Sequence, residues 1–277
     1  MLKTMCGDFW VINVADSNES CYEALMRIFL VSAGSLFVCL ISFWIVKLWG
    51  QSQVYHEYGH PMYSSSNQRI DFLKPTFKNL EADLKSKKFL YLDVAITQDQ
   101  KLVIPKRNWN PQERPIGYSL YEDIKNDVFL VQDFKNILKE KKIIFNIIEN
   151  TQAVHENFLF NMQQLGLERG ENFIVLSPYE APIKALKELV PSFIYGTTRP
   201  EIGKILALQS MNLIEAVSIR ADMIVQPLLI RKHNFFSSEL LTEISRRHKR
   251  IIVGPITQGE IEEAIKLKPY GLIIQEN

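Results

Sequence analysis

Beyond residue 66, short hydrophobic runs alternate with longer stretches of mixed polarity. The runs are rich in Ile, Val, Leu and Phe and are continuous rather than alternating, which is typical of strands buried on both faces. The pattern predicts strands at Phe89–Thr97, Ile143–Ile148, Asn172–Ser177, Ser192–Gly196, Asp222–Gln226, Ile251–Gly254 and Gly271–Ile274. An eighth candidate strand lies near Gln53–Tyr58.

The stretches between the runs carry apolar residues at helical spacing. They predict helices at Pro75–Lys85, Leu130–Lys139, Gln152–Leu165, Ala181–Leu189, Pro200–Gln209, Ser238–Arg247 and Glu260–Lys266. Pro75 and Pro200 suit a first helical turn, and Ser237 or Ser238 suits an N-cap. Strand–helix alternation with eight strands favours a (β/α)8 TIM-type barrel, and an open doubly wound sheet is the alternative.

One segment breaks this alternation. Ile28–Val46 holds 19 residues without a charge, between Arg27 and Lys47. At 1.5 Å per residue the run matches the roughly 30 Å hydrocarbon thickness of a bilayer. Trp44 and Trp49 suit an aromatic belt at the interface. We therefore expect a single-pass membrane protein; a buried core helix is the alternative, and the two flanking cations leave the side of the membrane open.

This segment divides the chain into four parts. We expect a polar tail over residues 1–25, a transmembrane helix over 26–49, a linker with the start of the first strand over 50–66, and the barrel domain over 67–277. Met26, directly before the apolar run, is a second candidate start of translation.

Composition limits the partners and the metal ligands that the chain can use. The 277 residues carry 32 Lys and Arg against 31 Asp and Glu, a net charge of +1, which gives no overall electrostatic basis for binding nucleic acid. The three cysteines are Cys6, Cys21 and Cys39. Any metal site beyond residue 39 therefore depends on oxygen and nitrogen ligands.

The loops after the C-terminal ends of barrel strands normally carry function. Asp93-Val94, Thr97, Asp99 and Leu102-Val103 match the spacing E-x-D-V-x-x-T-x-D-x-x-L-V-x-x-H-D. In this the chain resembles the glycerophosphodiester phosphodiesterase family. Further similar motifs follow in order at Ile144–Asn150, Asn172–Ser177, Ile251–Thr257 and Gly271–Gln275. The resemblance covers about residues 52–277 and implies a barrel that hydrolyses glycerophosphodiesters with a bound divalent cation, Ca²⁺ or Mg²⁺.

The departures from the family pattern fall on its polar positions. Family members carry a Glu two residues before the Asp, a His-Asp pair after the second strand, a metal-binding Glu in the third motif, a Trp on strand seven and a closing Asp. These positions hold Tyr91, Lys106 with Arg107, Ile148 with Glu149 beside it, Gly254 and Gln275. Because a hard divalent cation needs several carboxylate oxygens, the catalytic shell is expected to be largely lost.

The remaining candidates have two interpretations each. If a metal binds, Asp93, His56 and Glu149 are its candidate ligands, and His60 and Lys106 are the candidate catalytic residues. Lys106 and Arg107 are candidate phosphate ligands, since Arg offers a fork of donors. Otherwise Asp93 is a strand-end carboxylate with local hydrogen bonds, and the cations and histidines are solvated loop residues.

Two other motifs compete. The run from His56 to His60 matches H-E-x-x-H, the pattern of zinc proteases, but it needs one helix to carry both histidines, and Pro61 follows at once. The run from Arg246 to Arg250 complements the negative end of a helix, and its alternative role is contact with anionic lipid headgroups.

The leading hypothesis is a membrane-anchored, glycerophosphodiester phosphodiesterase-like barrel that has lost catalysis. It would bind or scaffold, with the bilayer and a phosphate-bearing lipid fragment, phospholipid headgroup or protein as partners. The alternative is an active metal-dependent phosphodiesterase of lipid metabolism with rearranged ligands.

Overall fold

The computed structural model describes residues 14–56, 59–61, 69–75, 80–106, 115–230 and 233–275. The chain forms two compact units, Met1–Gln53 and Val54–Asn277. Each unit is described by itself.

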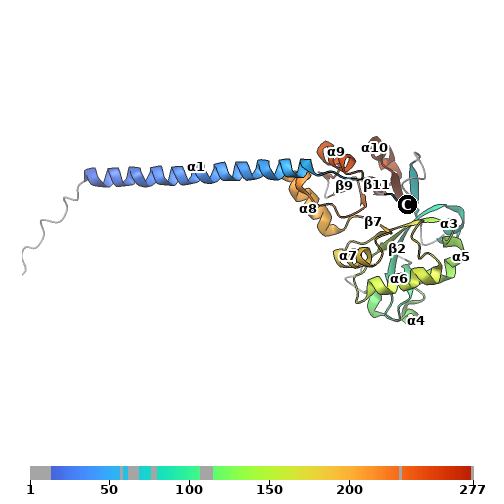
Figure 1. Cartoon of the computed structure of the whole chain (residues 1–277). Helices are drawn as coiled ribbons and strands as arrows, with labels where there is room; N and C mark the ends of the chain where they lie inside the picture. The colour runs from blue at the N-terminus through green and yellow to red at the C-terminus, as the bar shows by residue number, and fades with distance from the viewer. Residues whose placement is uncertain are drawn as a thin grey trace, which may run out of the picture. The chain divides into compact units, whose positions relative to one another are not determined.

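The first unit is dominated by one helix, α1 (Val14–Ser52), shown in Figure 1. Its part Leu25–Ser52 is long and apolar enough to cross a membrane, and a signal sequence near an N-terminus has the same features. The hydroxyls of Ser32, Ser35 and Ser42 donate to backbone carbonyls three or four residues earlier in the helix. The helix therefore satisfies its own serines, although it also extends into part of the predicted polar tail.

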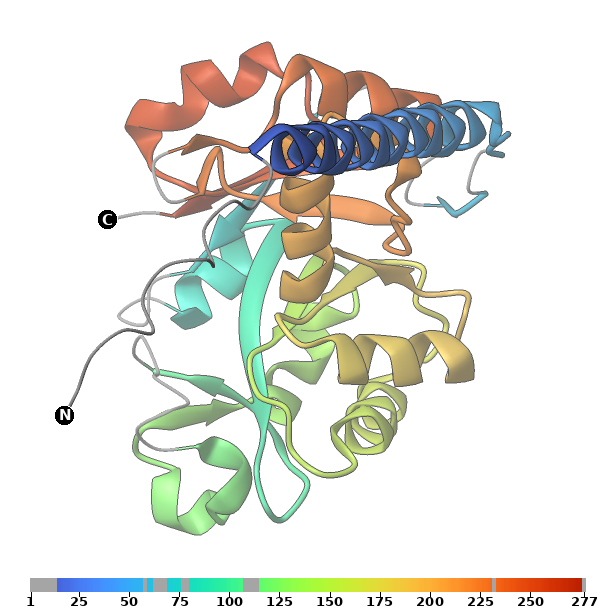
Figure 2. The same ribbon diagram turned by 90° about the vertical axis from the view of Figure 1, so that its left-hand side faces the viewer.

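The second unit is built on a barrel of eight parallel strands (Figures 1 and 2). Its order around the barrel is β7-β6-β5-β2-β1-β12-β11-β8. The strands are β1 (Ile70–Lys74), β2 (Phe89–Ile96), β5 (Lys142–Ile147), β6 (Phe173–Leu176), β7 (Ile194–Tyr195), β8 (Met223–Gln226), β11 (Arg250–Ile256) and β12 (Gly271–Gln275). The predicted (β/α)8 architecture is confirmed, and the open doubly wound alternative is wrong.

The seam between β7 and β8 closes the barrel with few residues. A parallel bridge joins Gly196 to Met223, and the Asp222 backbone N–H donates to the Tyr195 carbonyl at 2.8 Å. The Thr197 hydroxyl accepts from the backbone N–H of Val225 at 3.3 Å. A side chain at Gly196 would collide with Leu176, so the absence of a Cβ lets the strands approach.

The position of the first strand is a correction. Residues 53–56, part of the predicted eighth strand, form no strand, and β1 lies at Ile70–Lys74 instead. The sequence pattern misses it because Asp71 interrupts the apolar run. Asp71 is exposed and ion-paired with Arg69 at 2.7 Å, whereas Ile70 and Phe72 are buried in the barrel interior.

Helices cover the outside of the barrel (Figure 2). They are α3 (Leu80–Ser86), α5 (Lys135–Leu138), α6 (Val154–Leu165), α7 (Glu180–Leu189), α8 (Arg199–Ser210), α9 (Ser238–Arg246) and α10 (Ile261–Lys266). Ser237 caps α9 by accepting from the Leu240 N–H at 3.2 Å, and Pro200 lies in the first turn of α8, as predicted. The prediction of one helix over Leu130–Lys139 is wrong, since the end of β4 (Val128–Leu130), a 3₁₀ turn and α5 share this stretch.

A small insert follows β2. It contains β3 (Leu102–Pro105), the 3₁₀ turn η1 (Ile116–Tyr118), α4 (Tyr121–Ile124) and β4 (Val128–Leu130). β3 pairs antiparallel with both β2 and β4. The insert has its own buried cluster of Ala95, Val103, Ile116, Ile124 and Val128. It therefore packs as a separate layer at the C-terminal end of β2.

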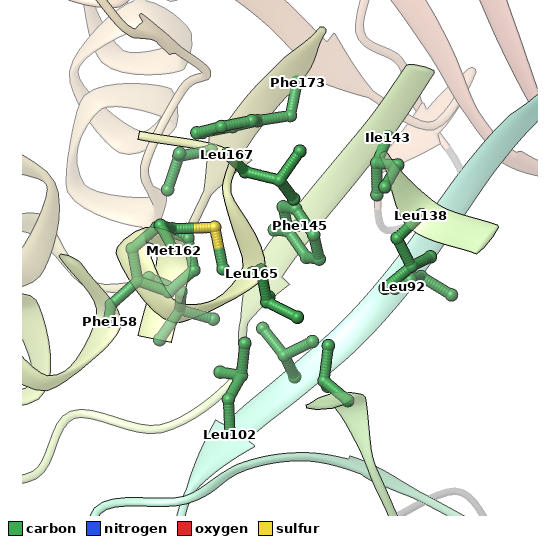
Figure 3. Close-up of a cluster of buried hydrophobic side chains, with 14 of the residues drawn as sticks. Leu92, Leu102, Leu138, Ile143, Phe145, Phe158, Met162, Leu165, Leu167 and Phe173 are labelled. Atoms are coloured by element: carbon green, nitrogen blue, oxygen red, sulfur yellow. The ribbon is translucent and has the colours of Figure 1, made fainter. Parts of the chain in front are cut away.

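Two hydrophobic layers hold the barrel together. One fills the interior, and the other lies between strands and helices, where Phe145 contacts Phe158 and Phe173 edge-to-face (Figure 3). Each aromatic ring of this kind contributes a large buried apolar area. The strands are therefore covered on both faces, as their continuous apolar runs indicate.

Candidate functional site

Three polar side chains meet inside the C-terminal mouth of the barrel. Lys74 ends β1, Asp93 lies in β2, and Asn146 stands directly opposite Asp93 on β5. The Lys74 ammonium lies 2.8 Å from Asp93 Oδ2, and the Asn146 amide donates to Oδ1 at 2.7 Å. Both oxygens of the carboxylate are therefore engaged. We call Lys74, Asp93 and Asn146 the mouth cluster.

Strand periodicity explains why these residues face inward. Side chains two apart on a strand share a face. Ile70 and Phe72 belong to the interior cluster, so Lys74 follows them on the same face of β1; Ile144 places Asn146 in the same way. The sequence therefore directs an ammonium, a carboxylate and an amide into a largely apolar barrel.

Tyr91 completes the surroundings of Asp93. It lies two residues before Asp93 on the same face of β2, and its ring lies 5.4 Å from the Lys74 ammonium. Burial, reinforced by the negative charge of Asp93, raises the pKa of Tyr91 well above its ordinary value. The phenol thus stays protonated and neutral. It stands at the position where the family pattern described above has a carboxylate.

The mouth cluster does not fit a divalent cation. Ca²⁺ and Mg²⁺ take six or more oxygen ligands from carboxylates, carbonyls and water. Asp93 is the one carboxylate of the mouth cluster, and Lys74 and Asn146 already occupy both of its oxygens. Within the described ranges, no three His, Cys, Asp or Glu side chains come together. The cavity beside Lys74, Tyr91 and Asp93 measures about 10 Å³, roughly the space of one water. The residues described here therefore hold an ammonium where the resemblance implies a metal.

Glu149, a predicted metal ligand, lies elsewhere. It is buried, and its two oxygens accept from the backbone N–H groups of Ile116 and Gly117 at 2.7 and 2.8 Å. Burial raises the pKa of Glu149, and these two hydrogen bonds oppose the shift. Glu149 therefore fastens the turn η1 of the insert and is not brought to Asp93.

Lys106 also belongs to the insert. Its ammonium donates to the Asn126 carbonyl at 3.0 Å and lies 4.6 Å from the centroid of the Phe129 ring. Arg107, its predicted partner in phosphate binding, falls outside the described residues. The pairing of Lys106 with Arg107 therefore stays a prediction.

The two histidines are not brought to the mouth cluster. His60 is buried beside Gly170, Glu171 and Asp222, which immediately precede β6 and β8 and so lie at the N-terminal end of the barrel. Burial lowers the pKa of His60, and the two nearby carboxylates oppose this shift. His56 is exposed.

The geometry of a zinc protease is not formed either. Neither His56 nor His60 lies in a helix, whereas the H-E-x-x-H mechanism needs both on one helical face.

Sequence reasoning missed Lys74 and the role of Asn146. Asn146 lies inside the stretch Ile144–Asn150 that carries the family resemblance. The motif therefore pointed to this residue, although not to its hydrogen bond with Asp93. Lys74 was missed because the first strand was predicted near Gln53–Tyr58. A correct β1 would have made Lys74 its last inward residue.

Comparison with solved structures places the fold. A putative glycerophosphoryl diester phosphodiesterase from Silicibacter pomeroyi matches with a TM-score of 0.59 at 10% identity, over 78% of this chain and 94% of its own. A glycerophosphodiester phosphodiesterase from Parabacteroides distasonis matches at 0.55 and 11% identity, over 76% and 94%.

A third similar structure is an Oleispira antarctica phosphodiesterase in complex with its product sn-glycerol-3-phosphate. It matches at a TM-score of 0.54 and 10% identity, over 77% of this chain and 94% of its own. No family model and no curated protein matches the chain by sequence. The chain therefore has the barrel fold seen in glycerophosphodiester phosphodiesterases.

Proposed function

We propose that this protein is a membrane-anchored barrel that binds a phosphate-bearing lipid fragment without hydrolysing it. The observation that carries the proposal is the ion pair between Lys74 and Asp93 in the mouth of the barrel. The alternative is a metal-dependent phosphodiesterase with rearranged ligands, and the activity experiment below discriminates between the two.

The charges of the mouth cluster favour binding over hydrolysis. An ammonium 2.8 Å from the carboxylate supplies the positive charge that a metal would otherwise supply, and it repels a second cation placed nearby. Lysine is a point-charge ligand for phosphate oxygens. In the Oleispira antarctica protein the same fold holds sn-glycerol-3-phosphate. A glycerophosphate group lying over the mouth cluster, outside the small cavity and against the 20% of the Lys74 side chain that stays exposed, is the corresponding proposal for this chain.

The ligand experiment measures activity and binding on the same sample. We expect the detergent-solubilised full chain to release no glycerol 3-phosphate from glycerophosphocholine with Ca²⁺ or Mg²⁺. We expect glycerol 3-phosphate to raise its melting temperature, and Lys74→Met to abolish that rise. Lys125→Met is the matched control, because Lys125 is exposed and paired with Glu122 on α4.

Two results contradict the proposal. Turnover that Asp93→Asn abolishes would establish the metal-dependent phosphodiesterase instead. An unchanged melting temperature over millimolar glycerol 3-phosphate would rule out binding of the phosphate group.

Membrane anchoring is the second part of the proposal. It is supported by the length and apolar composition of Leu25–Ser52 and by serines that hydrogen-bond within the helix. We expect the full chain to stay in the membrane pellet after alkaline carbonate extraction, with α1 present in its intact mass. Release into the supernatant, or a mass lacking α1, would replace the anchor by a cleaved signal sequence.

A further inference from the structure

A cavity of about 420 Å³ opens at the N-terminal end of the barrel, beside α9 and the end of α10. Five cationic residues line it: Arg69, Lys249, Arg250, Lys266 and Lys268. No Asp or Glu is among its lining residues in the described chain. We call it the basic cavity.

The barrel topology gathers these cations from three distant stretches. Arg69 precedes β1, Lys249 and Arg250 stand at the start of β11, and Lys266 and Lys268 lead into β12. β1, β12 and β11 are neighbours in the barrel, and parallel strands begin at the same end. The sequence run Arg246–Arg250 therefore supplies only two of the five cationic residues that line the cavity.

The other cations of that run have a structural role. Arg246 and Arg247 both bind the carboxylate of Glu243, at 2.6 and 2.5 Å. Arg247 is buried and also donates to the carbonyls of Val217 and Glu215. The positive charges of Arg246 and Arg247 complement the negative C-terminal end of α9. The run thus divides into a buried structural part and a part that lines the basic cavity.

Helix ends alone do not account for the basic cavity. One cation in the last turn complements the negative end of a helix, and Lys266 already does this for α10. Arg69 is paired with Asp71, and Lys249 donates to the Ala221 carbonyl. Arg250, Lys266 and Lys268 add further positive charges around the same cavity, and an anion in the cavity relieves the repulsion among them.

We infer that the basic cavity binds the phosphate headgroup of an anionic phospholipid. Its apolar lining, which includes Leu241, Ile244 and Tyr270, suits the glycerol and first acyl carbons next to a phosphate. Cationic side chains near a membrane surface attract anionic lipid. The combination of cations and apolar lining favours a lipid over a free phosphate ion.

Tyr55, in the linker after α1, contacts the barrel next to the basic cavity. The guanidinium groups of Arg246 and Arg247 lie 5.1 and 5.0 Å from the Tyr55 ring centroid. Ser245, the neighbour of Arg246, lines the basic cavity. Only Gln53 and Val54 separate Tyr55 from Ser52, the last residue of α1. This inference rests on the membrane anchoring of α1 proposed above. With α1 in the bilayer, a short stretch of chain tethers the barrel to the membrane.

A lipid titration tests the inference. The detergent-solubilised full chain is titrated with dioctanoyl phosphatidic acid, and native mass spectrometry counts the bound lipids. We expect one lipid to bind with saturation, and Lys266→Gln/Lys268→Gln to weaken its affinity at least tenfold. The control Lys101→Gln/Lys125→Gln removes the same charge from residues paired with Asp99 and Glu122 and is expected to bind like the unchanged chain.

Three results would overturn it. Dioctanoyl phosphatidylcholine binding as tightly as phosphatidic acid would show that the negative charge is not recognised. If inorganic phosphate bound as tightly as phosphatidic acid, the basic cavity would be a site for free phosphate. Equal weakening in the control would show unspecific attraction. The rise in melting temperature with glycerol 3-phosphate is expected to persist in Lys266→Gln/Lys268→Gln, so failure at the barrel mouth and failure at the basic cavity are distinguishable.

Discussion

The two ends of the barrel use charge in opposite ways. At the C-terminal mouth, an ammonium, a carboxylate and an amide satisfy one another around a cavity of about 10 Å³. At the N-terminal end, five cationic residues surround a cavity of about 420 Å³ that no carboxylate lines among the residues described. In (β/α)8 proteins the C-terminal end usually carries function and the N-terminal end stability. Here the mouth is internally paired, and the roomier site is at the other end.

The comparison shows that the two ends of one barrel differ in whether their charges are paired within the fold. The mouth cluster keeps the inward positions that strand periodicity dictates, but the side chains there neutralise each other. The N-terminal end combines the ion cluster of Glu243, Arg246 and Arg247, in which Glu243 and Arg247 are buried, with the basic cavity next to it. Stability and the proposed lipid binding therefore share one end of the barrel, and substitutions should separate them.

The largest effect is expected from Arg247→Met. This side chain is buried and binds Glu243, Val217 and Glu215, so its loss leaves a buried carboxylate and two carbonyls with fewer donors. We expect the free energy of unfolding to fall by about 3 kcal/mol. Urea unfolding of the detergent-solubilised full chain, followed by near-ultraviolet circular dichroism, measures it.

Arg246→Met is the matched control. It removes the other partner of Glu243. Because the Arg246 side chain is 29% exposed, we expect the free energy of unfolding to fall by about 1 kcal/mol or less. Equal losses in the two variants would mean that burial of Arg247 does not matter.

A smaller effect is expected at the mouth. Lys74→Met leaves Asp93 with fewer partners, and we expect a loss of about 1–2 kcal/mol. Adding Asp93→Asn should recover most of this loss, since no unpaired charge then remains. A double-mutant cycle in the same unfolding assay gives the coupling energy. Strictly additive losses would show that the two side chains are not coupled.

The smallest effect concerns His60 and pH. Burial lowers the pKa of His60 below its ordinary value of 6.5, so the unfolded chain binds a proton more readily than the folded one. Its contribution to stability is present above pH 6.5 and is lost as the pH falls toward the lowered pKa. We expect the stability advantage of the unchanged chain over His60→Gln to shrink between pH 7.5 and 5.5. An advantage that grows on acidification would reverse the sign and place a charged His60 in the folded state.

Much of the fold could be predicted from local pattern. Continuous apolar runs marked seven of the barrel strands, and Ser237 and Pro200 marked helix starts. β1 was not predicted because Asp71, which is ion-paired with Arg69 at the surface, interrupts the apolar run of this strand. The predicted helix after Leu130 failed for a related reason, since pairing of β4 with β3 overrides helical spacing there.

The candidate site was less accessible. Asp93 was found from its motif, but His60 and Glu149 are placed apart from it by the tertiary structure. His60 lies among residues that precede strands, whereas Asp93 lies far along β2. Glu149 follows Ile147, the end of β5, and turns to the insert instead of the barrel interior. Sequence distance says little about which end of a barrel a residue occupies.

The sequence by itself determined the barrel class, the long apolar helix and Asp93 as a candidate site residue, because hydrophobic pattern, length and motif spacing are local properties. Only the tertiary structure decided that Lys74 and Asn146 hold Asp93, and that cations from the starts of β1, β11 and β12 share one cavity. Those meetings depend on strand order and register around a closed barrel, and no local stretch of the chain encodes them alone.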